Sequence, residues 1–226
     1  MTGSARYILA SMRPQQWVKN FFVFAALIFA GHLRIAQDIL TTCFGFALFC
    51  LVASSVYLFN DIVDLEKDKL HPAKSHRPLP SGKLSVSTAS GAALILAVVA
   101  LSGGFLLKTE FGAVLLLYVA INILYTLKLK EAVILDVMTI AAGFVLRVVA
   151  GAFLISVPTS EWLIVCTVLL SLFLGFSKRR HELTILEAHA NTHRAVLQHY
   201  SPYFLDQMIG IVTASTVMSY TLYTIS

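Results

Sequence analysis

The sequence has little charge and few cysteines. Only 13% of its 226 residues are charged, about half the share found in a soluble domain, which excludes a water-soluble globular protein. The three cysteines, Cys43, Cys50 and Cys166, all lie within apolar runs. An odd number of thiols in such surroundings excludes a disulfide framework and a cysteine metal site. The formal net charge of +5 comes without any nucleic-acid-binding signature, so we expect no nucleic-acid partner.

Long apolar runs take the place of the missing charge. Hydrophobic residues make up 58% of the chain, and the runs are long enough for membrane-spanning helices rather than barrel strands. We predict an all-α, polytopic transmembrane helix bundle of about seven spans that forms one integral-membrane domain over residues 1–226. The expected spans are 17–36, 39–59, 86–107, 111–127, 132–156, 161–177 and 203–226.

The basic residues predict the orientation of this bundle. Most of the 17 lysines and arginines lie in the N-terminal arm and in the loops after the second, fourth and sixth expected spans. Positively charged loops remain in the cytoplasm. We therefore expect a multi-pass protein of the inner (cytoplasmic) membrane, with its N-terminus and a cavity on the cytoplasmic side.

Three aspartates stand within eight positions after the second expected span. Asp61, Asp64 and Asp68 follow an i, i+3, i+7 spacing, which a helix turning ~100° per residue would place within roughly 60° of one face. Carboxylates this close need a cation, and hard oxygen ligands favour Mg²⁺ over zinc. Lys74 and Arg77 follow and suit phosphate. The stretch predicts a Mg²⁺-diphosphate site, with a solvated charged loop between two membrane helices as the alternative.

The fifth expected span carries two charged residues. Asp136 lies just inside it, and Arg147 follows eleven positions later, a net turn of about 20° and a distance of roughly 16 Å along a helix. Arginine at membrane depth is costly and normally faces a polar cavity or a partner. We expect both residues to line one cavity, with Asp136 at its mouth. The alternative is a structural ion pair with another helix.

The motifs along the chain resemble one family. NDIVDLEKD, residues 60–68, resembles the first aspartate-rich motif of the UbiA superfamily of intramembrane prenyltransferases, and RPLPSGKLS, residues 77–85, fits it too. Within that superfamily the closest resemblance is to the decaprenyl-phosphate phosphoribosyltransferases. The segments that carry it are RPQQWVKN (13–20), HPAK (71–74), YTLKLK (125–130), LRVVAG (146–151) and SKRRHEL (177–183).

This resemblance implies a reaction and a set of site residues. The reaction is Mg²⁺-dependent transfer of 5-phosphoribose from phosphoribosyl diphosphate to a polyprenyl phosphate, with loss of diphosphate. Asp61, Asp64 and Asp68 are the expected metal ligands, and Asp61, Asp64 and Asp136 the expected catalytic residues. The expected substrate-binding residues are Lys19, Asn60, Lys74, Arg77, Tyr125, Lys128, Lys130, Arg147, Lys178, Arg179 and Glu182.

The chain also departs from the superfamily pattern. Members usually have a second aspartate-rich motif after the sixth span, where this chain reads KRRHELTILE, and they usually have nine spans, so we expect a member that is short at its C-terminus. The basic loop favours a sugar-phosphate donor. One alternative is a prenyltransferase that moves a prenyl chain from prenyl diphosphate to an aromatic or other small acceptor. Another is a membrane transporter or lipid-binding scaffold, although a transporter is expected to show paired halves with broken helices.

Overall fold

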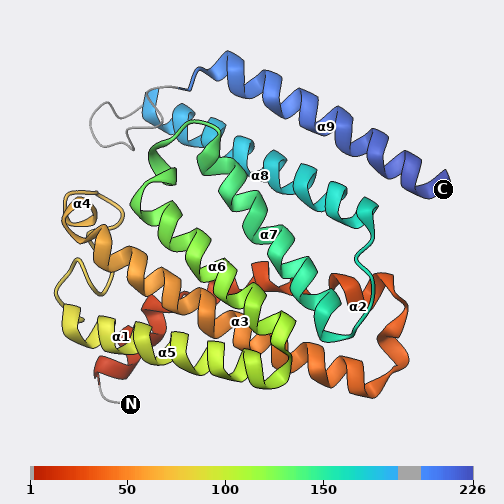
Figure 1. Cartoon of the computed structure of the whole chain (residues 1–226). Coiled ribbons are helices and arrows are strands. Elements are labelled where there is room, and N and C mark those ends of the chain that lie inside the picture. Colours follow the sequence, from red (N-terminus) through yellow and green to blue (C-terminus); the bar gives the residue numbers. More distant parts are fainter. Residues whose placement is uncertain (1–2, 188–199, 226) are drawn as a thin grey trace. The chain divides into compact units, whose positions relative to one another are not determined.

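The computed structural model describes residues 3–187 and 200–225, and within these residues the regular structure is entirely helical (Figure 1). The chain divides into two compact units. Unit 1 comprises Met1–Thr126 and Arg147–Pro158, and unit 2 comprises Leu127–Leu146 and Thr159–Ser226. Helix α7 contributes residues to both.

Six helices in the described part of the chain are long and apolar enough to cross a membrane. They are α3 (Ala36–Val63), α5 (Val86–Leu107), α6 (Thr109–Leu127), α7 (Leu135–Leu154), α8 (Glu161–Glu187) and α9 (Pro202–Ile225). Each corresponds to one of the last six predicted spans, and the prediction of an all-α membrane bundle is confirmed.

The first predicted span is not a single α-helix. After α1 (Gly3–Ser11), the chain forms the 3₁₀ helix η1 (Pro14–Phe24), the short α2 (Ala25–Phe29) and the 3₁₀ turn η2 (His32–Arg34). Within the predicted span, Lys19 and Asn20 of η1 interrupt the apolar character that a membrane α-helix needs.

The η1–α2 segment nevertheless runs antiparallel to α3 in unit 1. Its contacts move toward the start of α3 as its own numbering rises: Arg13 with Asp61, Trp17 with Ser54, Asn20 with Cys50, and Phe24 with Phe46. At about 2.0 Å per 3₁₀ residue and 1.5 Å per α residue, the segment is about 30 Å long, the thickness of the hydrocarbon core. It can therefore cross the membrane as a seventh span without being one continuous α-helix.

The loop between α3 and α5 is held against unit 1 by apolar side chains. Leu79 and Leu84 of this loop are buried together with Leu58 of α3 and Ala89 of α5. Ser85 begins α5 by accepting a hydrogen bond from the backbone N–H of Thr88 at 3.1 Å. Figure 1 shows α3 and α5 side by side, with the loop and the short α4 (Leu65–Lys69) at one end. This packing fixes the charged loop residues over the end of α3.

In unit 2, α8 and α9 pack side by side, and the first part of α7 joins their core. The buried residues of this core are Val137, Phe176, Tyr200, Leu205 and Val212. The 3₁₀ turn η3 (Leu129–Glu131) precedes α7. Tyr200, which precedes α9, is 5% exposed and brings a hydroxyl group into this core.

Candidate active site

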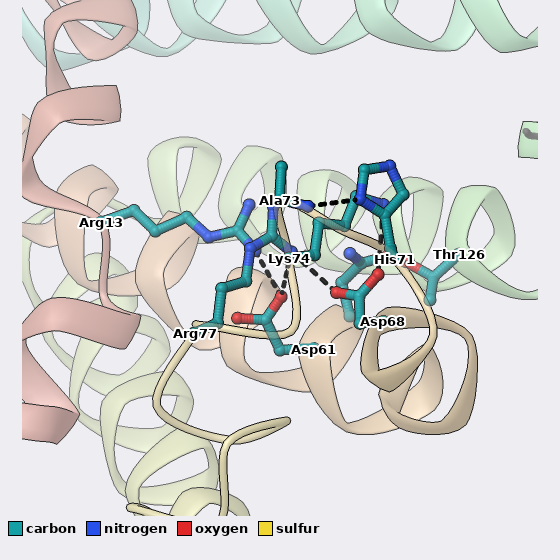
Figure 2. A network of polar contacts seen from close by, with 9 residues as sticks. Arg13, Asp61, Asp68, His71, Ala73, Lys74, Arg77 and Thr126 are labelled. Carbon is teal, nitrogen blue, oxygen red and sulfur yellow. Dashed lines mark hydrogen bonds and ion pairs between the residues drawn. The ribbon is translucent and has the colours of Figure 1, made fainter. Parts of the chain in front are cut away.

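Two buried aspartates meet at one arginine in unit 1. A single nitrogen, Nη1 of Arg77, lies 3.2 Å from Oδ1 of Asp61 and 2.8 Å from Oδ2 of Asp68 (Figure 2). Both aspartates are 2% exposed. Since one cationic nitrogen contacts both carboxylates, these two acids, seven positions apart, lie close together.

Two further cations complete this group. The guanidinium of Arg13 forms an ion pair with Oδ1 of Asp61, and Nζ of Lys74 lies 3.1 Å from Oδ1 of Asp68. The three basic side chains are 25–31% exposed, whereas the two carboxylates are buried beneath them. We call Arg13, Asp61, Asp68, Lys74 and Arg77 the acid–cation cluster. Its three cations and two carboxylates leave one positive charge that faces solvent.

The chain bends where the acid–cation cluster forms. Helix α3 ends at Val63, Asp64 is its C-cap residue, and α4 begins at Leu65, so the three aspartates do not lie on one uninterrupted helix. The backbone N–H of Asp68 still bonds to the carbonyl of Asp64 at 2.8 Å, which keeps the helical spacing close. Asp64 is half-buried. Asn60 accepts a hydrogen bond from Thr126 at 3.3 Å, so the ends of α3 and α6 meet here.

The cluster has the donor set for Mg²⁺. Within the described residues, no group of three or more His, Cys, Asp or Glu side chains comes together as a metal site. Mg²⁺ needs less than that, because it is commonly held by one or two carboxylates together with substrate phosphates. Asp61 and Asp68 supply two hard oxygen ligands that one cationic nitrogen already bridges. These residues therefore fit a metal that arrives together with a phosphorylated substrate.

Arg147 is buried in unit 1 among neutral and aromatic groups. Its Nε donates to Oδ1 of Asn20 at 2.8 Å, and its Nη2 donates to the hydroxyl of Tyr118 at 3.1 Å. The guanidinium also lies over the rings of Phe49 and Tyr118, 5.1 and 4.9 Å from their centroids. Hydrogen bonds and cation–π contacts reduce the cost of this charge at membrane depth. Arg147 thus joins η1, α3, α6 and the end of α7.

Asp136 belongs to unit 2 and pairs with an arginine there. Its Oδ2 accepts from Nε of Arg179 at 2.6 Å, and its Oδ1 accepts from the hydroxyl of Tyr200 at 2.7 Å. The same arginine donates through Nη1 to Glu182 at 2.7 Å. Burial, and next the hydrogen bond to Asp136, raise the pKa of Tyr200 to about 12. This is the helix-to-helix ion pair that was the alternative to a cavity role for Asp136.

The remaining predicted substrate-binding residues are distributed over both units. Lys19, on η1, and Tyr125, on α6, are half-buried in unit 1. Lys128 and Lys130 lie at η3 and belong to unit 2. Lys178 is exposed on α8, with Nζ 4.0 Å from Glu182. Their roles in substrate binding stay predictions.

Arg13 is the one member of the acid–cation cluster that is not among the site residues predicted from the sequence. It lies 48 positions before Asp61, and nothing in the local spacing links the two. The available signal was the Arg-Pro step at the start of RPQQWVKN, because a residue before proline is pushed out of the α conformation.

The fold and the site define an intramembrane, helical protein with a buried acid–cation cluster at one end of α3. Residues 20–182 match the UbiA prenyltransferase family, and the chain belongs to that family. It is accordingly a membrane transferase, which sets aside the transporter and scaffold alternative.

Curated relatives are similar in sequence to nearly the whole chain. The chain is 32% identical over 223 residues to a decaprenyl-phosphate phosphoribosyltransferase of Mycolicibacterium smegmatis, covering 97% of this chain and 70% of that protein. It is also 32% identical to one of Corynebacterium glutamicum, covering 96% of this chain and 66% of the relative. The chain thus spans about two thirds of the length of such relatives.

The solved structures agree in fold. A UbiA homologue from Archaeoglobus fulgidus, bound to DMAPP and Mg²⁺, superposes with a TM-score of 0.77 at 18% identity and covers 95% of this chain and 76% of the other. This similarity supports the helical arrangement described here.

Proposed function

We propose that this protein transfers 5-phosphoribose from phosphoribosyl diphosphate to a polyprenyl phosphate and releases diphosphate, with the acid–cation cluster as its donor site. The observation that carries the proposal is the excess of cations over carboxylates in the cluster, at the motif that the phosphoribosyltransferase resemblance singled out. Charge-assisted contacts from guanidinium and ammonium groups are the usual means of holding phosphate.

The chemistry divides between the metal and the chain's own residues. Mg²⁺, held by Asp61 and Asp68 with Asp64 as the third predicted ligand, would supply charge stabilisation for the departing diphosphate. Lys74 and Arg77 would bind its phosphate oxygens. As the bond between the sugar's C1 and the diphosphate oxygen breaks, a new bond forms between C1 and an oxygen of the lipid phosphate. That oxygen is already anionic at neutral pH, so the reaction needs no strong general base.

The proposed setting is the cytoplasmic face of the inner membrane. The contact between Arg13 and Asp61 supports this, because it places the N-terminal arm and the acidic loop at the same end of unit 1, as the positive-inside pattern predicts. Phosphoribosyl diphosphate is a water-soluble anion, so its site has to face the compartment that holds it. The polyprenyl chain would lie along the apolar helix surfaces.

The test offers the purified protein two substrate pairs with Mg²⁺. We expect labelled lipid from phosphoribosyl diphosphate with polyprenyl phosphate, and none from labelled prenyl diphosphate with an aromatic acid. The second candidate, prenyl transfer, has its own support in a digeranylgeranylglyceryl phosphate synthase of Saccharolobus solfataricus that is 36% identical over 78 residues. Product from the prenyl pair alone would select that candidate and contradict the proposal.

A further inference from the structure

Arg13 is held in an unusual backbone conformation between two helices. Its φ of 54° and ψ of 63° are left-handed, and the following Pro14 begins η1. A residue other than glycine adopts this conformation at an energetic cost, and such residues concentrate at functional sites. Ser54 contacts the chain on both sides of Arg13, because its Oγ lies 3.1 Å from the backbone carbonyl oxygen of Met12 and accepts a hydrogen bond from the side-chain Nε1 of Trp17 at 3.1 Å.

The side chain of Arg13 shares its acceptor with another cation. Oδ1 of Asp61 receives the guanidinium of Arg13 and also Nη1 of Arg77, at 3.2 Å. Asp61 and Asp68 together carry two negative charges against the three positive charges of Arg13, Lys74 and Arg77. Each guanidinium also has five N–H donors, so the two arginines keep donors for a further anion. Arg13 is 25% exposed, with its guanidinium over the ring of Tyr57, 5.2 Å from the centroid. An anion that enters from solvent can therefore reach both arginines.

We propose that Arg13 is a further ligand of the donor's diphosphate group, held on Asp61 until that group arrives with its metal ion. This inference rests on the proposed function, because it adds a residue to the same donor site. A Mg²⁺ ion bound to Asp61 would be repelled by the two guanidiniums that already contact the same carboxylate oxygen. Arg13 relieves this repulsion if it exchanges Asp61 for another anion, and a phosphate oxygen of the diphosphate that binds the same metal is such an anion.

This exchange of partners predicts opposite effects for two ligands. Without the Arg13 charge, no arginine at this position competes with Mg²⁺ for the Asp61 carboxylate, so Mg²⁺ alone should bind more tightly. The complex of Mg²⁺ with diphosphate should bind more weakly, because a charge-assisted contact to phosphate is lost. A purely structural ion pair between Arg13 and Asp61 predicts the first effect without the second.

The experiment is calorimetric titration of the purified protein with Mg²⁺ alone and with inorganic diphosphate in saturating Mg²⁺. Arg13→Gln should weaken diphosphate binding at least about tenfold, as expected for one charge-assisted contact, while Mg²⁺ alone binds more tightly. Arg13→Gly should do the same, and it accepts the left-handed backbone without strain, so misfolding would not explain the loss. Arg6→Gln is the matched control, because Arg6 is an exposed cation of the same arm; less than a twofold change is expected.

Unchanged diphosphate affinity in both Arg13→Gln and Arg13→Gly would overturn the inference. An equal loss in Arg6→Gln would also overturn it, since the effect would then come from the general charge of the arm. A different result would refute the proposed function without affecting the Arg13 assignment. Wild-type protein that binds diphosphate through Arg13 but makes no phosphoribosyl lipid would leave the Arg13 assignment in place and refute the reaction.

Discussion

The amide oxygen of Asn20 accepts a hydrogen bond from Nε of Arg147 at 2.8 Å, although the two residues are 127 positions apart. This contact ties η1 to the end of α7 within unit 1. The backbones of η1 and α7 lie close together near this contact. A Cβ atom added to Gly151 would lie only 2.0 Å from the backbone carbonyl oxygen of Val23. This contact holds the N-terminal arm beside α3 together with the contacts of Arg13, Trp17 and Asn20 with α3.

Arg147→Leu should therefore destabilise the protein. Removing the guanidinium leaves the buried polar groups of Asn20 and Tyr118 short of a partner, at about 1–3 kcal/mol each, and loses cation–π contacts worth up to about 2 kcal/mol. The relief of burying an arginine in the membrane is about 2.5–3.5 kcal/mol. The summed losses, about 2–8 kcal/mol, are larger than the gain over most of this range, so the melting temperature in detergent should fall.

The cavity interpretation of Arg147 predicts the opposite change in stability. If Arg147 contacts substrate and does not hold η1, the Arg147→Leu protein should be more stable and less active than the wild type. A double-mutant cycle with Tyr118→Phe checks the contact itself. We expect a coupling free energy of about 0.5–3 kcal/mol, because the two side chains share a hydrogen bond and a cation–π contact. Additive effects would mean that Tyr118 does not hold the arginine.

Asp61→Asn should reduce both turnover and stability. It removes a charge from the predicted Mg²⁺ ligands, for which we expect at least a ~10²-fold loss of turnover. It also replaces the charged acceptor that Arg13 and Arg77 share with a neutral, weaker one, so the melting temperature should fall. Turnover and melting temperature are measured on the same preparation. Glu66→Gln is the control, because Glu66 is an exposed acid of the same stretch paired with Lys69 at 2.7 Å. Its turnover should stay within about twofold, as expected for a surface ion pair.

Much of the fold could be predicted because apolar runs and their flanking residues determine membrane helices locally. The predicted span 86–107 matches α5 at both ends, since Ser85 provides an N-cap and the polar Lys108 follows the apolar run. The first span was different. Its hydropathy predicted a crossing segment, but residues 17–24 are 3₁₀-helical, and the contact of Asn20 there with the buried Arg147 follows from no local pattern.

The candidate site could be predicted only where it depends on local spacing. Asp61 and Asp68 were expected together because a continuous helix would bring i and i+7 residues to one face. They do lie together, although the helix is interrupted at Asp64 between α3 and α4. The pairing of Asp136 with Arg179 joins residues 43 positions apart and depends on how α7 and α8 pack. Such a pairing leaves no periodic pattern in the sequence. The contact between Arg13 and Asp61 could not be predicted for the same reason, because the two residues are 48 positions apart.

The membrane orientation can be tested by cysteine labelling. After replacement of the three native cysteines by serine, Ile35→Cys should react with a membrane-impermeant maleimide in intact cells, and His76→Cys only after lysis. Both positions are exposed, and they lie at opposite ends of the α3 region. Gln15→Cys should behave like His76→Cys, because Arg13 contacts Asp61 near the loop. The reverse pattern would move the donor site away from the cytoplasm.

Tyr200 should make the stability of the protein sensitive to alkaline pH. Its pKa is raised from 10.0 to about 12 in the folded chain, mainly by burial, so the unfolded chain loses this proton first. Stability is therefore retained below about pH 10 and falls as the pH rises toward 12, by up to about 2–3 kcal/mol. Unfolding measured at pH 9 and pH 11 should show a smaller drop in Tyr200→Phe. An equal drop in both proteins would mean that other groups cause it.

The fate of a labelled phosphate tests the central claim most directly. Wild-type protein receives Mg²⁺, polyprenyl phosphate and phosphoribosyl diphosphate labelled either at the 5-phosphate or at the β-phosphate. We predict that the 5-phosphate label enters the lipid and that the β-phosphate label is released as free diphosphate, both dependent on Asp61. A β-phosphate label in the lipid, or no labelled lipid while the protein binds the donor, would contradict phosphoribosyl transfer.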